Sequence, residues 1–342
     1  MSPAPGTPPA GRFKKLINDP FQVVDEALEG FVATHDGIVA LAEPRVVVRR
    51  TPATDKVGLV IGGGSGHEPA FVGYVGQGLA DAAACGNVFA SPSAEIVLAA
   101  IRAAHHGRGV LVGYGNYAGD VLNFGLAVQL AAAEGIEARE IRVSDDVASA
   151  PRGEADRRRG IAGDIIVFKV AGAAAERGDA LDEVARLADK ANAATHSIGI
   201  ALSACEVPGS GGPTFDLPPG EIEIGMGVHG EPGIRRGPLQ PADELAGVLV
   251  DALVADMGEG ARGAEVALLV NGLGATAHMD QYILYRGARH ALEAAGLRVV
   301  RSYVGEYITS LEMSGASLTV TVLDPELLAL LDAPAHTVVI QR

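Results

Sequence analysis

The 342-residue sequence contains no tryptophan, only 8 phenylalanines and 7 tyrosines, and just two cysteines, Cys85 and Cys205. Two cysteines cannot build a disulfide framework, so the sequence favours a reducing compartment and predicts a cytoplasmic protein. No uninterrupted apolar run reaches the length of about 18 residues that a membrane-crossing helix needs. The first residues also lack the apolar stretch of a signal peptide.

Positive charge is scarce as well. The chain has 27 Lys and Arg against 42 Asp and Glu, a net charge of −15 with neutral histidines. Nucleic acids and anionic membrane surfaces are bound by clustered cations, so neither is expected as a partner. The acidic balance favours solubility instead.

Glycine is the residue in excess. The 45 glycines among 342 residues are nearly twice the usual share of about 7%. No collagen-like period organises them, so they are expected at turns and at places where backbone approaches another group closely.

Short apolar runs alternate with helical patterns from Phe13 onward, which predicts an α/β fold. We expect two α/β domains, residues 13–194 and 195–342, each with a central, largely parallel or mixed sheet flanked by helices. Whether the last strand returns to the first domain is left open. The Pro-rich residues 1–12 are predicted to be a disordered tail.

Two local predictions bear on the later argument. The apolar run Ile165–Phe168 is predicted to be a strand, and the acidic pair Asp145-Asp146 a solvated turn. Other strands are expected at Val46–Val48, Val57–Ile61, Val110–Val112, Ile141–Val143, Ile198–Ala204, Glu221–Val228, Val266–Val270, Val299–Val304 and Leu318–Leu323, and helices at about 20–34, 94–104, 121–133, 181–194, 241–256, 280–295 and 325–331.

Three glycine clusters end in, or surround, an ionisable residue. The first, Gly62–Gly66, follows an expected strand and leads into His67. This glycine loop would place free backbone N–H groups beyond the carboxyl end of that strand. It is neither a Walker A loop nor a nucleophile elbow, and it lacks the full dinucleotide fingerprint. A tight surface turn is the alternative.

The second cluster, Gly113–Gly119, precedes Asp120, which is either a helix N-cap or a base beside a ligand. The third, Gly225–Gly233, encloses His229. Flanking glycines leave that imidazole sterically open, as a nucleophile or base needs, although a lone histidine is more often structural.

Metal binding competes as an explanation, since the chain has nine histidines. His105 and His106 are adjacent, and adjacent side chains of a helix do not converge on one ion. No H-E-x-x-H motif occurs, and neither cysteine has a cysteine near it in the sequence. No metal ligands are therefore assigned.

Many longer motifs resemble one known family, the substrate-binding K subunits or K domains of dihydroxyacetone kinases. The resemblance covers the chain from about Phe13 to Arg342. Its motifs are KKLINDP (14–20), GGGSGHEPAFVGYVGQG (62–78), FASPS (89–93), GNYAGDVLNF (115–124), RRGIAG (158–163), GAAAERG (172–178), HSIGIALSAC (196–205), GVHGEPGI (227–234) and NGLGAT (271–276).

The resemblance implies a homodimer of two-domain protomers that holds a short ketose covalently, as a hemiaminal on a histidine nitrogen. That histidine falls on His229, and the acid–base pair near the phosphoryl-accepting hydroxyl falls on His67 and Asp120. Other substrate-binding positions fall on the glycine-rich loop, Gly64, Ser65 and Gly66, and on Ser91 of the F-x-S-P motif.

No Walker A loop, no kinase glycine loop with its lysine and no acidic D-x-D-x-G-x-N motif occurs in this chain. The resemblance therefore implies that the chain binds no cofactor itself. ATP or ADP with Mg²⁺ is expected on a separate nucleotide-binding L-type subunit.

The motif GNYAGD (115–120) departs from the KNYTGD of many phosphoenolpyruvate-linked K subunits and is closer to ATP-linked and erythrulose-type kinases. Both dihydroxyacetone and the four-carbon erythrulose stay open as substrates. A ketose-sensing transcriptional co-regulator without kinase activity is the alternative function. The presence of both His67 and Asp120 favours the enzyme. An unrelated nucleotide-binding α/β protein would rest on the first glycine loop alone.

Overall fold

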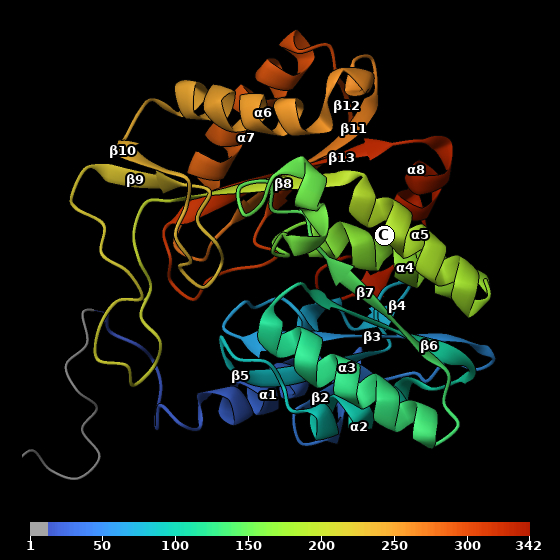
Figure 1. Ribbon diagram of the computed structural model, residues 1–342. Helices are drawn as coiled ribbons and strands as arrows, with labels where there is room; N and C mark the ends of the chain where they lie inside the picture. Colours follow the sequence, from blue (N-terminus) through green and yellow to red (C-terminus); the bar gives the residue numbers. More distant parts are fainter. Residues whose placement is uncertain (1–12) are drawn as a thin grey trace, which may run out of the picture.

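The computed structural model describes residues 13–342, so the predicted tail, residues 1–12, lies outside the described part of the chain. Figure 1 shows two sheets stacked with helices between them and on both outer faces. The predicted α/β class, with two sheets flanked by helices, is confirmed.

The first sheet has strand order β1-β2-β5-β3-β6-β7. Strands β5, β3, β6 and β7 run parallel, while β1 and β2 form an antiparallel edge. The elements of this half are α1 (Val23–Thr34), β1 (Val39–Glu43), β2 (Val46–Arg49), β3 (Lys56–Ser65), η1 (Val72–Tyr74), β4 (Gly76–Gln77), β5 (Ala82–Val88), α2 (Ala94–Ala104), β6 (Gly107–Gly115), α3 (Ala118–Ala133), β7 (Ala138–Val143), η2 (Arg152–Arg157), α4 (Asp164–Arg177) and α5 (Leu181–Ala193).

The second sheet has strand order β10-β9-β8-β13-β11-β12 and is mixed, because only β11 and β12 pair in parallel. Its elements are β8 (Thr195–Ala201), β9 (Glu221–Ile224), β10 (Arg235–Pro238), α6 (Ala242–Met257), η3 (Glu259–Ala261), β11 (Glu265–Gly272), α7 (His278–Ala294), β12 (Arg298–Gly305), β13 (Gly315–Leu323), α8 (Pro325–Asp332) and β14 (His336–Thr337).

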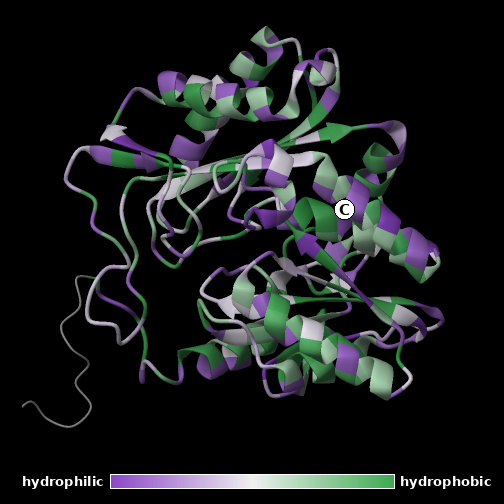
Figure 2. Ribbon diagram, viewed as in Figure 1, coloured by the Kyte–Doolittle hydropathy of each residue, from purple (hydrophilic) through white to green (hydrophobic). Residues whose placement is uncertain are grey.

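Helices α2 and α3 cover the outer face of the first sheet, and α6 and α7 cover the outer face of the second (Figure 1). Between the sheets lie α4, α5 and α8. One apolar core includes Leu59 of β3, Phe168 of α4, Leu269 of β11 and Leu331 of α8, so it joins the two halves. Figure 2 shows hydrophobic residues along both sheets and on the helices between them.

The predicted boundary after residue 194 falls between α5 and β8. The division of the chain into two domains at this boundary stays a prediction, because residues of both halves pack into one shared apolar core. The final strand β14 pairs with β4 of the first half, with His336 opposite Gln77 and Thr337 opposite Gly76.

Two local predictions were wrong. Ile165–Phe168 belongs to helix α4, whose residues from Asp164 to Ala175 are all buried, so its apolar run reflects a helix enclosed on every side. Asp145 and Asp146 are fully buried. Asp145 accepts hydrogen bonds from the N–H groups of Ile161 and Gly163 (2.8 Å each), and the Arg159 guanidinium pairs with Asp146 (2.7 Å).

Candidate active site

The loops that follow β3 and β6 meet at one edge of the first sheet, because these neighbouring strands are parallel. His67 follows β3, and Asp120 is the third residue of α3, which follows β6. The glycines here permit close packing: a Cβ on Gly63 would lie 2.6 Å from the Phe71 ring, and one on Gly64 would lie 2.7 Å from the Ala90 nitrogen.

The second half contributes His229, from the segment between β9 and β10. Its Nε2 lies 3.0 Å from Nε2 of His67. On the far side of each ring stands an acceptor: the Thr309 carbonyl oxygen lies 2.7 Å from His67 Nδ1, and Glu231 Oε1 lies 2.9 Å from His229 Nδ1. The second Glu231 oxygen accepts the His229 backbone N–H at 3.0 Å.

These contacts fix the hydrogens on the two rings. Both Nδ1 atoms face oxygen acceptors, so each carries a hydrogen. A hydrogen bond between the two Nε2 atoms requires one more, so the pair holds three hydrogens and one ring is an imidazolium. Burial, together with the charge of His229, lowers the pKa of His67 to about 3, so Nε2 of His67 is the acceptor of the hydrogen bond between the rings.

Glu231 balances that charge. Burial alone would raise the pKa of Glu231, but the hydrogen bond from His229 and its charge lower the pKa to about 2. Aromatic rings hold the imidazoles in place: Phe89 stacks on His67 with centroids 5.0 Å apart, and Tyr117 meets His229 edge to face at 4.7 Å.

The two histidines and Asp120 line one small cavity between the halves of the molecule. Three buried polar atoms there have no protein partner in the described chain: Asp120 Oδ1, Asp164 Oδ1 and the Tyr117 hydroxyl. Buried polar groups without partners are uncommon and indicate a place for a ligand. The lining residues are Gly62, Gly63, Gly64, His67, Phe71, Gly115, Tyr117, Asp120, Gly160, Asp164, Val228, His229 and Ile308.

Asp120 does not cap a helix. The N-cap of α3 is Tyr117, and Asp120 lies within the first turn. Burial raises the pKa of Asp120 to about 6, against the opposing effects of a hydrogen bond from Ser91 and the charge of His229. A carboxyl with such a pKa exists in both forms near neutral pH, as a general base requires.

The structure brings His67, Asp120, His229 and Gly64 together at this cavity, with Ser91 against Asp120. Ser65 and Gly66 do not line it: the Ser65 hydroxyl bonds the Gly86 carbonyl (2.8 Å), and the Gly66 N–H bonds the Glu68 carboxylate (3.0 Å).

Sequence reasoning missed four residues of the site, Tyr117, Asp164, Glu231 and Thr309. Glu231 had a signal, because it stands two positions after His229 within the same glycine cluster. Asp164 had no such signal, since it lies outside the glycine clusters and directly before the run Ile165–Phe168 that was predicted to be a strand. Thr309 contributes only its carbonyl oxygen, which no sequence pattern reveals.

Across residues 13–342, no group of three His, Cys, Asp or Glu side chains is arranged to hold a metal ion. Within the same range, no helix is both long and apolar enough to cross a membrane.

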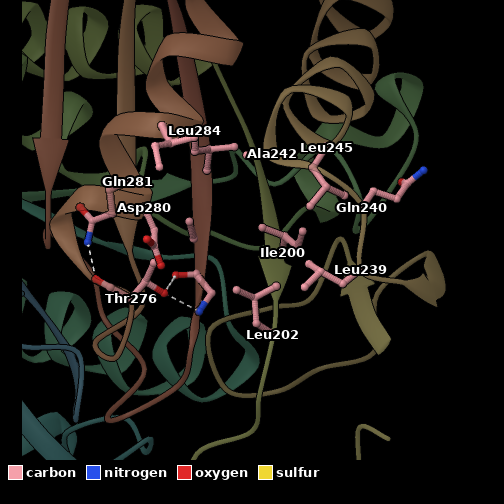
Figure 3. A pocket seen from close by; sticks show the side chains of 13 residues that line it. Ile200, Leu202, Leu239, Gln240, Ala242, Leu245, Thr276, Asp280, Gln281 and Leu284 are labelled. Atoms are coloured by element: carbon pink, nitrogen blue, oxygen red, sulfur yellow. Dashed lines mark hydrogen bonds between the residues drawn. The ribbon is translucent and has the colours of Figure 1, made fainter. Parts of the chain in front are cut away.

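A second pocket lies on the outer side of the second sheet, between α6 and α7 (Figure 3). Ile200, Leu245 and Leu284 give it an apolar lining, and Asp280 is its one ionisable lining residue. The Thr276 hydroxyl donates a hydrogen bond to the Gly315 carbonyl (2.6 Å), while the side-chain oxygens of Gln240 and Gln281 have no partner among the described residues. It offers no reactive group like those of the histidine cavity.

Comparison with known proteins identifies the family of the chain. The model of the Dak1 domain matches residues 29–339. The chain is 46% identical to the dihydroxyacetone-binding subunit DhaK of the PTS-dependent dihydroxyacetone kinase 2 of Listeria innocua, over 95% of this chain and 98% of that protein. It is 48% identical to the L-erythrulose kinase of Pectobacterium atrosepticum over 94% of this chain, but it spans only 55% of that longer protein.

Two solved structures are also similar. The dihydroxyacetone kinase operon co-activator Dha-DhaQ superposes with a TM-score of 0.87 at 35% identity, covering 92% of this chain and 97% of that one. The dihydroxyacetone kinase of C. freundii, in complex with AMP-PNP and Mg²⁺, gives a TM-score of 0.84 at 36% identity, covering 95% of this chain and 60% of that one.

The fold and the site thus define a substrate-binding unit of a kinase that phosphorylates an alcohol. The chain belongs to the Dak1 family, the substrate-binding K subunits and K domains of dihydroxyacetone kinases.

Proposed function

We propose that this chain holds a short ketose as a hemiaminal on His229 and presents its terminal hydroxyl for phosphorylation. The observation that carries the proposal is the contact of His229 Nε2 with His67 Nε2, at 3.0 Å, in a cavity that also contains the unpartnered carboxyl oxygen of Asp120. A nucleophile, a proton carrier and a base therefore surround a space suited to a few heavy atoms.

Hemiaminal formation uses the shared proton. The proton between the two Nε2 atoms moves to His67 and from there to the ketose carbonyl oxygen, while His229 Nε2 forms a bond to the carbonyl carbon. The carbonyl π bond breaks and becomes a hydroxyl. The His229 ring keeps one positive charge, which the Glu231 carboxylate at 2.9 Å neutralises before and after the step.

The covalent bond would select ketoses over glycerol, because glycerol has no electrophilic carbon. It would also fix the terminal hydroxyl for in-line attack on a phosphoryl group, a positioning effect worth several kcal/mol. Asp120 would accept the proton of that hydroxyl, with His67 beside it.

The phosphoryl donor would come from a separate L-type subunit carrying ATP or ADP with Mg²⁺. In support, the chain covers 98% of the dihydroxyacetone-binding subunit DhaK of Listeria innocua but only 60% of the C. freundii kinase solved with AMP-PNP and Mg²⁺. We propose a cytoplasmic homodimer of this chain as the form that meets that partner.

The covalent step can be tested with dihydroxyacetone carrying ¹³C at its carbonyl carbon. On binding, the carbonyl ¹³C resonance should be replaced by that of a saturated carbon bonded to oxygen and nitrogen. His229→Ala should bind the ketose at least tenfold more weakly and leave the carbonyl resonance in place. An unchanged carbonyl resonance in a saturated wild-type complex would show that the ketose binds non-covalently.

The second candidate function is a ketose sensor, favoured by the likeness to the co-activator Dha-DhaQ. The presence of Asp120 with a pKa of about 6 favours the kinase, because a sensor has no need of a base. Ketose-dependent phosphoryl transfer with an L-type partner, lost in Asp120→Asn, separates the two functions. A wild-type chain that binds ketose but supports no transfer with L-type partners is a sensor.

A further inference from the structure

Two of the three unpartnered atoms in the cavity have no task in the proposed reaction. These are Asp164 Oδ1 and the hydroxyl of Tyr117, and both residues line the same cavity as the catalytic histidines. Asp164 is only 2% exposed. Leaving such an atom without a hydrogen bond destabilises the folded chain, so a ligand group that pairs with it would recover that free energy.

Two glycines line the cavity beside these two groups, where a side chain would not fit without displacing its neighbours. A Cβ on Gly115 would lie 3.3 Å from the Tyr117 ring and 3.5 Å from Asp164 Oδ2. A Cβ on Gly160 would lie 3.0 Å from Asp164 Oδ1 and 2.6 Å from the Gly115 Cα. We call Gly115, Tyr117, Gly160 and Asp164 the glycine recess.

The chemistry of the recess matches a neutral hydroxyl group. Burial raises the pKa of Asp164 well above its usual range, and the nearby carboxyls of Asp145 and Asp120 raise it further. This shift favours the neutral carboxyl of Asp164, which can both donate and accept a hydrogen bond. Burial likewise raises the pKa of Tyr117, so the phenol keeps its hydrogen. No Lys or Arg lines the cavity, which disfavours a phosphate or carboxylate there.

The number of free groups indicates the length of the ketose. With its carbonyl carbon on His229 and one terminal hydroxyl at Asp120, dihydroxyacetone has a single hydroxyl left on the other arm. A four-carbon 2-ketose oriented with its C1 hydroxyl at Asp120 has two, on C3 and C4. The glycine recess offers two unpartnered polar atoms, Asp164 Oδ1 and the Tyr117 hydroxyl.

Resting on the proposed hemiaminal at His229, we propose that the glycine recess binds the longer arm of a four-carbon ketose. Asp164 and Tyr117 pair with the hydroxyls of that arm, and Gly115 leaves the room that the extra carbon needs. The site thereby prefers erythrulose over dihydroxyacetone, and the phosphoryl group goes to the C1 oxygen.

The test compares calorimetric affinities for D-erythrulose, L-erythrulose and dihydroxyacetone in the wild type and in three variants. Gly115→Ala fills the recess, Tyr117→Phe removes one hydroxyl, and Asp164→Leu removes the carboxyl. Each should lower the ratio of erythrulose affinity to dihydroxyacetone affinity about tenfold, the effect of one lost hydrogen bond or one misplaced methylene. Asp164→Asn, which still donates and accepts, should restore most of the ratio.

Tyr114→Phe is the matched control, because Tyr114 is a buried tyrosine of β6 that does not line the cavity and bonds Glu140 instead (3.1 Å). It should leave the ratio unchanged. With an L-type partner, NMR of the phosphorylated erythrulose should place phosphorus on the C1 oxygen.

The proposal is overturned if the wild type prefers dihydroxyacetone, or if the recess variants weaken both ketoses equally. Phosphorylation at C4 would overturn the orientation. A wild type that binds none of the three ketoses refutes the proposed function itself, and this outcome is distinct from the loss of preference.

Discussion

Asp120 is the residue whose chemistry depends most directly on pH. Burial raises its pKa to about 6, and only the ionised form can accept the proton of the ketose hydroxyl. We expect kcat/KM for phosphoryl transfer to rise with pH up to about 6 and to level off above it. Asp120→Asn should lower kcat by about 100- to 10,000-fold and remove this dependence, as measured in a coupled assay with an L-type partner.

Thermal unfolding provides the control for that variant. The pKa of Asp120 is raised in the folded state, so its contribution to stability is full below the unfolded pKa of about 4 and is lost as pH rises through about 6. Asp120→Asn should therefore unfold at an equal or higher temperature than the wild type at pH 8, and the difference should shrink at pH 4. If the inactive variant unfolds at a lower temperature than the wild type at pH 8, damage to the fold rather than the loss of the base would explain its lost activity.

Among single residues, the sequence indicated the three ionisable side chains that meet in the cavity but not all of the groups that adjust them. His67 and Asp120 follow a glycine cluster, His229 lies within one, and the fold brings all three to one cavity. One group that adjusts them lies far off in the sequence. The acceptor for His67 is the carbonyl oxygen of Thr309, 242 residues away, which only the folded chain places within reach.

Among the elements, α4 shows why a sequence pattern fails. A helix on a surface has an apolar stripe at helical spacing, but α4 packs between the sheets and is buried on every side over its first three turns. The short run Ile165–Phe168 then resembles a buried strand, and periodicity cannot distinguish the two. Helix α5 buries only one face and keeps its apolar stripe, and its predicted range, Leu181 to Ala194, agrees with the observed helix to within one residue.

The C-terminal segment supports the loop that contributes Phe71 to the cavity. Strand β14 pairs with β4, and the Val339 N–H bonds the Gly73 carbonyl at 3.2 Å. A Cβ on Gly73 would lie 2.9 Å from Val339, so the two segments touch closely. The side chains of Val339 and Ile340 also pack against the core between the sheets.

Deleting residues 336–342 should therefore weaken both stability and ligand binding. Removing the partly buried Val339 and Ile340 should lower the free energy of unfolding by about 2–4 kcal/mol, as measured by urea denaturation. The affinity for ketose should fall because the 69–78 loop loses its paired strand. His336→Ala, which changes an exposed side chain but keeps the strand pairing, should match the wild type. A truncated chain with unchanged affinity for ketose would show that the 69–78 loop keeps its conformation without the C-terminal strand.

For the whole molecule, the decisive feature is that the site joins two halves which already share a core. His67 and His229 come from opposite halves, and the Thr309 and Leu311 N–H groups bond the carbonyls of His67 (3.1 Å) and Gly66 (2.8 Å). Contacts of this kind, together with an apolar core that both halves share, favour unfolding as a single unit even though the chain contains two sheets.

We therefore expect one calorimetric unfolding transition that moves as a whole when a ketose binds. At a free ketose concentration of 100 times Kd, binding stabilises the folded chain by about 2.7 kcal/mol, which shifts Tm by about 4 °C for a chain of this length. Glycerol at the same concentration should shift it far less, and His229→Ala should show little response to ketose. Two separate transitions, with only the second responding to ketose, would mean that the halves unfold independently and that His229 binds without support from His67. A single transition whose Tm rises equally with glycerol would show that the carbonyl group does not contribute to binding, because glycerol differs from dihydroxyacetone only at that group.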